Sequence, residues 1–521
     1  MPLNPDQQEV VLTHQGAIAL ISGPGSGKTT TLLARHESII SNGARLDEVL
    51  NITFTKEAAE TMKKRAGGKG HFRTFHSYGY HVISQELGRP PMEPELRNRL
   101  LFKLLRTYGC EYKELTSYIS RMRHRNITPT QALDEDSRNP YARAYRDYEA
   151  QRISAGWIDF DSMICDAVAL LEKPEVRARH QWKFVMADEC QDTDDLQFRM
   201  LQLVTEKHGN IMCVGDPGQS IYMFRGARPE NLLDFMRWFP QGRYMYLGKN
   251  YRSTHSITRF VRENYPIETP LRDKLLPVRP ENGTAVEYRM FGTEYDEAES
   301  AVVCANKDAL NSAILTRTNR GLALAENFCV ENNIKYHLLG SSGFWHQSEI
   351  RRTIEKLKTL PDLPTEAAVN IILPEIESKY RVEDATPEDN DALENLGTLR
   401  QISRRYPLCK EFTAFANRAM HAKKTRGIIL STVHQAKGGE WTNVFVIGVR
   451  ADMMPHIKGD YEEEKRIWFV AISRAKDNLR ISWAGTPSSY LRSYLTPEVL
   501  DKLRENQGNV ERLQRQFNLI S

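Results

Sequence analysis

The chain contains 521 residues, of which 40% are hydrophobic and 26% are charged. This composition excludes a disordered or fibrous protein. The length exceeds what one hydrophobic core can hold, so we expect about three or four units of roughly 150 residues each. The 71 basic and 67 acidic side chains leave a formal net charge of +4, which by itself indicates no polyanionic partner.

Two features argue against secretion and against a membrane location. No segment approaches the ~18 uninterrupted apolar residues of a membrane span, and the start MPLNPDQQEVV lacks the basic-then-apolar layout of a signal peptide. The 7 cysteines are scattered singly without a CxxC pair, so neither a disulfide framework nor a zinc module is indicated. We therefore expect a cytoplasmic protein with reduced thiols and no membrane partner.

The first part of the chain alternates apolar strands with helices. The run AIALIS at 17–22 ends in a glycine-rich turn, and apolar residues then recur at helical spacing. Further apolar runs at 49–55, 183–188 and 210–216 predict strands of a parallel α/β sheet. Charged helical sequence interrupts them. We expect a first α/β domain in two parts, 1–81 and 172–247, separated by a helical insertion at 82–171.

A second strand-rich region is predicted to begin near Met245. Its strands are predicted at 284–291, 312–317, 334–340, 427–434 and 443–449. Acidic, proline-punctuated helical sequence breaks this region in the middle. The simplest account is a second α/β domain at 248–358 and 426–490, a second helical insertion at 359–425 and a tail at 491–521.

A phosphate-binding loop follows the first strand. The stretch SGPGSGKT at 22–29 matches the Walker A pattern from Gly25 onward, with Ser22 where the strict motif has its first glycine. Glycines let backbone N–H groups face phosphates at the start of a helix, a lysine adds a point charge, and a threonine hydroxyl ligates Mg²⁺. The alternative is an ordinary glycine turn. The residues predicted to bind ATP here are Gly25, Ser26, Gly27, Lys28, Thr29 and Thr30, with Thr29 on the metal.

The acidic stretch VMADECQDTDD at 185–195 follows another apolar run. It is typical of a nuclease metal cluster, of the magnesium end of a nucleotide-hydrolysis site, or of a solvated turn. Because a Walker A loop needs a carboxylate strand beside it, we predict that Asp188 holds Mg²⁺ through water and that Glu189 is the general base. Asp192 is assigned to loop geometry or the catalytic network, and Asp194 and Asp195 to the charge pair of a helix N-terminus.

Nine motifs along the chain resemble those of superfamily 1A helicases of the UvrD, Rep and PcrA type. They occur in the order of that family and span nearly the whole chain. They are LNPDQQ (3–8), GPGSGKTT (23–30), NITFTKEAAETMKKR (51–65), RTFHSYG (73–79), DECQDT (188–193), VGDPGQSIYMFRGA (214–227), NYRST (250–254), STVHQAKGGEW (431–441) and VAISRAK (470–476). The resemblance implies two RecA-like P-loop NTPase domains that use ATP and Mg²⁺.

The resemblance also assigns roles around the nucleotide. It implies that Gln7 reads adenine, Tyr251 stacks on the base, Gln219 senses the γ-phosphate, Glu440 is a second-domain acid near the nucleotide, and Arg252 and Arg474 are arginine fingers. Such planar donors neutralise charge that develops on the transferred phosphoryl group. The alternative for the two arginines is an ordinary surface ion pair.

For single-stranded DNA and its junctions with duplex, the resemblance implies an aromatic track. Three positions match aromatic residues that stack on bases: Phe54, Tyr222 and Phe224, the last where relatives usually have tryptophan. Two histidines, His76 and His434, match strand-contact motifs. Arg225 matches the residue that links the aromatic track to the ATP site. The alternative for each aromatic ring is core packing. The basic segments 63–73 and 121–125 are either phosphate contacts or solvated helix faces.

The second insertion is strongly reduced relative to the family. Two functions stay open. The first is a 3′ to 5′ helicase or translocase in DNA repair, replication or phage DNA metabolism. The second is a DNA-stimulated ATPase subunit that regulates a separate nuclease or a defence or repair complex. Either function admits a protein partner such as a nuclease, a polymerase or a single-strand-binding protein.

Overall fold

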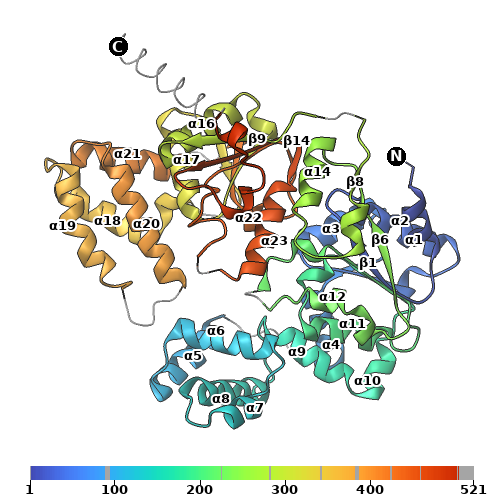
Figure 1. Ribbon diagram of the computed structural model, residues 1–521. Coiled ribbons are helices and arrows are strands. Elements are labelled where there is room, and N and C mark those ends of the chain that lie inside the picture. Colours follow the sequence, from blue (N-terminus) through green and yellow to red (C-terminus); the bar gives the residue numbers. More distant parts are fainter. Residues whose placement is uncertain are drawn as a thin grey trace. The chain divides into compact units, whose positions relative to one another are not determined.

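A computed structural model describes most of the chain (Figure 1). The described residues are 2–88, 94–223, 226–280, 283–340, 343–381, 387–422, 425–457, 459–501 and 503. They divide into two compact units, the first comprising 1–251 and 267–276 and the second comprising 252–266 and 277–521. The seven segments proposed from the sequence are a finer partition than these two units, and their boundaries stay predictions.

Six parallel strands form the sheet of the first unit, in the order β3-β2-β4-β5-β1-β6. Strands β1, β2, β4 and β5 are buried along their whole length, as is typical of parallel sheets, whose strands are continuous apolar runs. The bounds are β1 Ala17–Ser22, β2 Val49–Thr53, β3 His71–Thr74, β4 Phe184–Ala187, β5 Ile211–Gly215 and β6 Arg243–Leu247. The α/β fold class is confirmed.

Met245 lies in the first sheet, so the second strand-rich region begins later than the sequence predicts. In β6, Arg243 lies opposite Ile18 and Leu247 lies opposite Ser22 of β1. Parallel partners are distant in sequence and meet only through tertiary packing, so an apolar run does not reveal which sheet it joins.

Several helices of the first unit begin at a capping side chain. Thr55 accepts from Ala58 N–H, and Asp194 accepts from Gln197 N–H as the sequence predicts for a helix start. The helices are α1 Pro5–Leu12, α2 Lys28–Ser41, α3 Lys56–Arg65, α4 Phe75–Leu87, α9 Ser162–Leu171, α10 Pro174–Arg179, α11 Asp195–Thr205, α12 Glu230–Leu233, α13 Phe235–Trp238 and α15 Pro270–Lys274.

Between α4 and α9 the described chain forms four helices with an apolar core of their own. That core includes Leu101, Leu115, Ile119 and Tyr145. The helices are α5 Pro94–Tyr108, α6 Tyr112–His124, α7 Pro129–Glu135 and α8 Pro140–Ser154. The predicted start of this insertion at residue 82 falls inside α4, because that helix continues to Leu87.

The second unit is built on another six-stranded parallel sheet, in the order β11-β12-β10-β13-β14-β9. Its strands are β9 Glu287–Phe291, β10 Ser312–Thr316, β11 Tyr336–Leu338, β12 Ile428–Thr432, β13 Trp441–Val446 and β14 Ala475–Ala484. A separate short ladder pairs β7 (Lys249–Asn250) with β8 (Leu276–Pro277). The sequence does not predict strand β14, because the first half of this strand carries charged and polar residues.

Helices α18 to α21 form a second helical group, and they share one apolar core with α17 around Trp345, Phe412 and Phe415. The helices of the unit are α14 His255–Glu263, α16 Glu294–Asn306, α17 Asn319–Glu331, α18 Ser348–Lys358, α19 Thr365–Glu377, α20 Pro387–Ser403, α21 Cys409–His421, α22 Val433–Ala436 and α23 Tyr461–Ile472. Among the described helices, none combines the length and the apolar character that a membrane crossing requires.

Candidate active site

The glycine-rich loop lies between the end of β1 and the start of α2. Gly25 and Gly27 have φ of 69° and 80°, and Gly27 precedes the first residue of α2, Lys28. Only glycine adopts this left-handed backbone readily, which is why the loop needs it at both positions. The first-turn N–H groups of α2 have no acceptor within the helix, so together with the Lys28 ammonium they form an anion site.

Gln7 and Tyr251 lie beside this loop. Asn4 and Gln7 cap α1 reciprocally, and the Gln7 Nε2 donates to the Ser26 carbonyl at 3.0 Å. The Asn4 Nδ2 donates to the Tyr251 hydroxyl at 2.6 Å. The Tyr251 N–H in turn donates to the Gly25 carbonyl at 2.9 Å. The loop, the start of α1 and the tyrosine are therefore one hydrogen-bonded group.

Arg35 holds the other end of α1, a role that the sequence analysis missed. This side chain of α2 is 1% exposed and donates to the carbonyl oxygens of Val10 at 2.8 Å, of His14 at 3.2 Å, and of Thr13. The last carbonyls of a helix have no partner inside it, so the guanidinium takes the place of a C-terminal cap. The sequence carried no signal for this role, because the burial of an arginine is decided by the fold.

Asp188 and Glu189 follow the end of β4. The Asp188 N–H donates to the Ile52 carbonyl at 2.8 Å, and the Asp188 Oδ1 accepts from the Glu189 N–H at 3.0 Å. Burial and the neighbouring Glu189 carboxylate raise the pKa of Asp188, while the Lys28 ammonium lowers it. These contacts place the carboxylate near the lysine, and oxygen ligands such as Asp188 and the Thr29 hydroxyl fit Mg²⁺. Glu189 has a left-handed backbone, with φ of 55°, which is costly for a residue with a side chain.

Gln219 is buried in a 3-10 turn, Pro217–Gln219, directly after β5. Its Nε2 donates to the Asp216 Oδ2 at 2.6 Å. The same aspartate caps the turn through the Gly218 N–H at 3.1 Å.

Arg65 of α3, which lies in the basic segment 63–73, donates to the Thr30 hydroxyl at 3.3 Å. It therefore belongs to the surroundings of the glycine loop, a place that the sequence did not indicate.

In the second unit, Arg252, Glu440 and Arg474 lie close together. The Arg252 Nε is 2.6 Å from the Glu440 Oε2, and Lys476 is 2.9 Å from the other oxygen. Burial opposes ionisation of Glu440, but Arg252 and Lys476 outweigh it and lower the pKa of that carboxyl. Arg474 is 2% exposed and donates to the Val470 carbonyl at 3.0 Å. Their finger roles remain predictions.

Two pairs of aromatic rings mark the predicted strand path in the first unit. The rings of Phe54 and Tyr222 are nearly parallel, with an angle of 4° between their planes and centroids 6.2 Å apart. His76 stacks on Phe160 at 4.0 Å and 12°. The Phe160 ring is 64% exposed, which is unusual for a large apolar side chain and which the sequence analysis did not single out. Burial lowers the pKa of His76, so this ring favours the neutral form.

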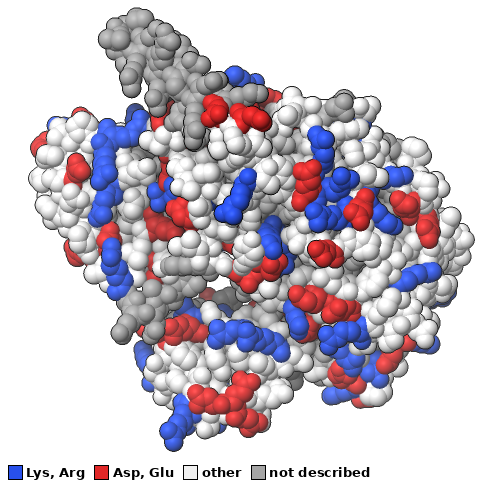
Figure 2. All heavy atoms as spheres, viewed as in Figure 1, with Lys and Arg blue, Asp and Glu red and all other residues white. Residues whose placement is uncertain are grey.

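A cavity of about 750 Å³ is lined by Phe54, His76 and Phe160 together with residues of α6 and α11. Arg121 and Arg125 contribute to its lining, and Figure 2 shows basic side chains along α6. Arg123, in contrast, is 4% exposed and pairs with Asp159 at 2.7 Å and with Glu149. Arg123 therefore fits neither alternative left open for 121–125, a phosphate contact or a solvated helix face, because it is buried and its neighbours in the insertion neutralise the guanidinium.

His434 lies half-buried on α22 of the second unit. Phe224 and Arg225 lie outside the described residues. Their assignments rest on the motif alone.

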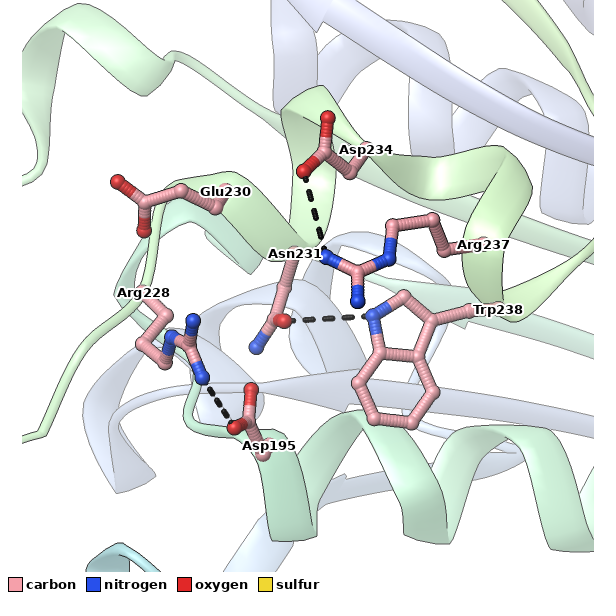
Figure 3. Close-up of a pocket in the computed structure, with 7 residues that line it drawn as sticks. All are labelled: Asp195, Arg228, Glu230, Asn231, Asp234, Arg237 and Trp238. Atoms are coloured by element: carbon pink, nitrogen blue, oxygen red, sulfur yellow. Dashed lines mark hydrogen bonds and ion pairs between the residues drawn. The ribbon is translucent and has the colours of Figure 1, made fainter.

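A separate pocket of about 340 Å³ lies at α11 to α13 (Figure 3). Arg228 pairs there with Asp195 at 2.5 Å, and Arg237 pairs with Asp234 at 3.7 Å. The Trp238 Nε1 donates to the Asn231 Oδ1 at 3.3 Å. Each guanidinium of this pocket has a carboxylate partner within it, and the residues predicted for ATP or DNA do not line it.

Two family models match nearly the whole chain. The UvrD/REP helicase N-terminal domain matches residues 3–240, and the UvrD-like helicase C-terminal domain matches residues 245–379 and 372–486. The second match is broken near the end of α19. The match to the C-terminal domain model is therefore interrupted inside the second helical group, where the sequence predicts a reduced insertion.

Curated relatives agree with these models along the chain. The chain is 26% identical to the ATP-dependent DNA helicase PcrA of Staphylococcus aureus (strain MRSA252) over 643 positions, which cover 98% of this chain and 88% of that protein. It is also 26% identical to PcrA of Staphylococcus epidermidis (strain ATCC 12228), covering 94% and 84%. Because 643 aligned positions exceed the 521 residues here, that relative contains segments that this chain lacks.

Proposed function

The chain belongs to the UvrD/Rep family of DNA helicases, which are DNA-dependent ATPases, and we propose that it moves 3′ to 5′ along single-stranded DNA and unwinds duplex ahead of it. The main support is the loop at 214–223, in which Gln219 donates to Asp216, whose N–H is linked through Gln191 to Glu189, and Tyr222 lies parallel to Phe54. One short segment thus touches both the hydrolysis site and the base-stacking site.

For hydrolysis, we assign nucleotide binding to the glycine loop and Mg²⁺ to Thr29 and Asp188. Glu189 would take a proton from the attacking water, and Gln219 would contact the γ-phosphate. Gln7 would read the adenine edge, Tyr251 would stack on the ring, and Glu440 would lie near the nucleotide. Arg252 and Arg474 would act on the transition-state charge, which predicts a loss of turnover rather than affinity when either is replaced.

For DNA, we assign base stacking to Phe54 and Tyr222, supported by their parallel rings. Two parallel rings with centroids 6.2 Å apart offer flat faces on which bases can stack. Stacking reads no sequence, which suits a protein that must move over any strand. Phe160 extends this track beside His76. Phe224 and Arg225 are assigned by motif alone, and so is His434 as a strand contact.

A second function, regulation of a separate nuclease or of a repair or defence complex without processive unwinding, is favoured by one observation. The C-terminal family model breaks near α19, and relatives contain segments that are missing here. A protein with a smaller second insertion offers less surface for duplex. It would then depend on a partner such as a nuclease, a polymerase or a single-strand-binding protein.

The domain plan that we propose keeps the segments of the sequence analysis. Two RecA-like domains, 1–81 with 172–247 and 248–358 with 426–490, carry helical insertions at 82–171 and 359–425. The separate apolar core of α5 to α8 supports the first insertion. Helices α18 to α21 share their core with α17, which makes the second insertion a closely attached group.

Strand displacement on duplexes with a 3′ or a 5′ single-stranded tail tests the proposal. We expect ATP-dependent unwinding of the 3′-tailed substrate only. Lys28→Ala should abolish both unwinding and DNA-stimulated hydrolysis, while the exposed control Lys207→Ala should leave them unchanged. DNA-stimulated hydrolysis without displacement of either substrate would favour the regulatory subunit. Near-normal hydrolysis by Lys28→Ala would refute the phosphate-loop assignment.

A further inference from the structure

Gln191 is a buried amide whose hydrogen-bonding groups are all used. It is 0% exposed and lies two residues after Glu189, in the 3-10 turn Cys190–Asp192. Its Nε2 donates to the Glu189 Oε2 at 2.6 Å and to the Asp192 Oδ2 at 3.3 Å. Its Oε1 accepts from the Asp216 N–H at 3.0 Å. The side chain therefore connects the end of β4 to the end of β5.

The orientation of this amide follows from its partners. Carboxylates only accept and a backbone N–H only donates, so the amide nitrogen must face Glu189 and the oxygen must face Asp216. Gly215 provides the space, because a Cβ at that position would lie 2.4 Å from the Gln191 Oε1. The arrangement thus needs a glycine at the end of β5 and a long amide after Glu189.

A continuous path leads from the proposed base to the proposed γ-phosphate sensor. It runs from Glu189 through Gln191 to the Asp216 backbone, and the Asp216 Oδ2 accepts from the Gln219 Nε2 at 2.6 Å. A second contact reaches the strand path, since the Ser220 hydroxyl donates to the Gln191 carbonyl at 2.9 Å. Ser220 is two residues from Tyr222, the ring that lies parallel to Phe54.

The backbone of Glu189 is fixed by hydrogen bonds on both sides of its Cα. The Glu189 N–H is held by the Asp188 carboxylate, and the Glu189 carbonyl accepts from the Asp192 N–H at 3.0 Å. With the main chain fixed in a left-handed conformation, only the side-chain torsions of Glu189 can change the orientation of its carboxylate. A strong hydrogen bond to a charged oxygen can stabilise one of these orientations.

From this geometry we propose that Gln191 is a positioning residue that couples DNA binding to hydrolysis. A base that stacks on Tyr222 shifts the loop at 216–223. Because the Asp216 N–H is hydrogen-bonded to the Gln191 side chain, that amide moves with the loop. The amide then orients the Glu189 carboxylate towards the attacking water. Gln191 touches neither ATP nor DNA in this scheme. The inference rests on the proposed function, because it requires both a catalytic Glu189 and stimulation by single-stranded DNA.

The test compares Gln191→Met with the parent in steady-state hydrolysis, with and without a single-stranded oligonucleotide. Methionine keeps the length of the side chain but neither donates to Glu189 nor accepts from Asp216. We expect DNA-stimulated kcat to fall about ten- to hundredfold, KM for ATP to change less than about twofold, and the ratio of stimulated to basal turnover to approach one. Gln202→Met is the matched control, since Gln202 donates to the Trp238 carbonyl at 2.9 Å, outside this path.

Two further variants separate positioning from loss of structure. In a Glu189→Gln background, Gln191→Met should add no further loss of turnover, because its effect passes through the base that is already absent. An additional loss there would overturn the positioning role. Should Gln191→Met fail to fold, Gln191→Glu retains the acceptor for Asp216 and turns a negative oxygen towards Glu189, and the same collapse of stimulation is expected. A stimulation ratio equal to the parent's would overturn the inference.

The parent protein distinguishes the two levels of failure. If the parent shows no DNA-stimulated hydrolysis, the proposed function fails and the inference fails with it. If the parent is stimulated and Lys28→Ala is inactive, but a folded Gln191→Met variant keeps the parent's stimulation, only the inference is wrong.

Discussion

Replacing Arg123 by methionine tests whether a buried ion network holds the exposed ring of Phe160. Arg123 of α6 donates to both oxygens of Asp159, at 2.7 and 3.0 Å, and pairs with Glu149 of α8. The Tyr148 hydroxyl donates to the same Asp159 carboxylate at 2.6 Å. Asp159 directly precedes Phe160, which stacks on His76. The network therefore fastens the segment that carries this ring.

We expect Arg123→Met to lower the free energy of unfolding by about 3 kcal/mol. Removing one member of a buried ion pair costs about 3–5 kcal/mol, because the other charge stays buried without its partner. The lower value applies because both carboxylates retain another partner in the variant. Glu149 is still paired with Arg152 at 2.7 Å, and Asp159 still accepts a hydrogen bond from the Tyr148 hydroxyl. At about 2–4 °C per kcal/mol for a unit of this size, the midpoint of thermal unfolding should fall by roughly 6–12 °C.

The pH dependence of the difference in stability between the parent and Arg123→Met identifies the cause of that difference. Burial raises the pKa of Asp159, but Arg123 and the hydrogen bonds outweigh it and bring the pKa to about 2. Because this lies below the unfolded value of about 3.9, the ionised carboxylate stabilises the parent above that pH, and the contribution is lost as the pH falls towards 2. Without the guanidinium, burial favours the protonated acid. The difference between parent and variant should therefore shrink below about pH 5.

Thermal unfolding of the parent, Arg123→Met and a control, Arg146→Met, from pH 4 to 8 measures the effect. Arg146 lies on α8, is half exposed and pairs with Asp147 at 2.8 Å, so its replacement should lower the midpoint by no more than about 3 °C. Equal losses in the two variants, or a loss for Arg123→Met that is the same at every pH, would refute the reasoning from a buried charge.

Three further predictions follow from individual contacts. Arg35→Met frees the C-terminal end of α1, the helix whose start carries Gln7, so KM for ATP should rise about tenfold with kcat nearly unchanged in steady-state assays; an unchanged KM would contradict a role of Arg35 in holding α1 in place. Burial raises the pKa of Glu297 from 4.5 to about 7, so the folded state of the parent becomes less stable as the pH rises between those two values. Glu297→Gln should therefore raise the midpoint of thermal unfolding at pH 8 but not at pH 4.5. Phe160→Ala should weaken single-stranded DNA binding about tenfold in fluorescence titrations and leave KM for ATP unaltered; an affinity equal to the parent's would make Phe160 irrelevant to binding.

The features that local sequence determines are those whose physics is local. The strands β1, β2, β4 and β5 are apolar runs, because a parallel sheet buries them on both faces. The loop before Lys28 needs glycines wherever the backbone is left-handed, so its motif is legible without a structure. The motif order likewise suffices to indicate the family, which the domain models then show.

Tertiary structure decided what depends on residues distant in the chain. The sequence could not show that Met245 lies in a strand beside β1, nor that residues 267–276 return to the first unit, where Leu275 packs against Gly23. Polar strand β14 was hidden for the same reason, since its neighbours β13 and β9 supply the pairing that its own composition does not predict.

The same division holds within the candidate site. The residues proposed to bind phosphate and metal could be recognised in the sequence, because each proposed role demands a particular chemical group at a particular spacing. Arg35, Gln191 and Phe160 could not, because glutamine, arginine and phenylalanine have many ordinary uses in a protein. Their importance here comes from partners brought by the fold: three carbonyls at the end of α1, the Asp216 N–H beside Glu189, and the ring of His76. A hydrogen bond or a stack depends on distance and direction in space, and those exist only after the chain has folded.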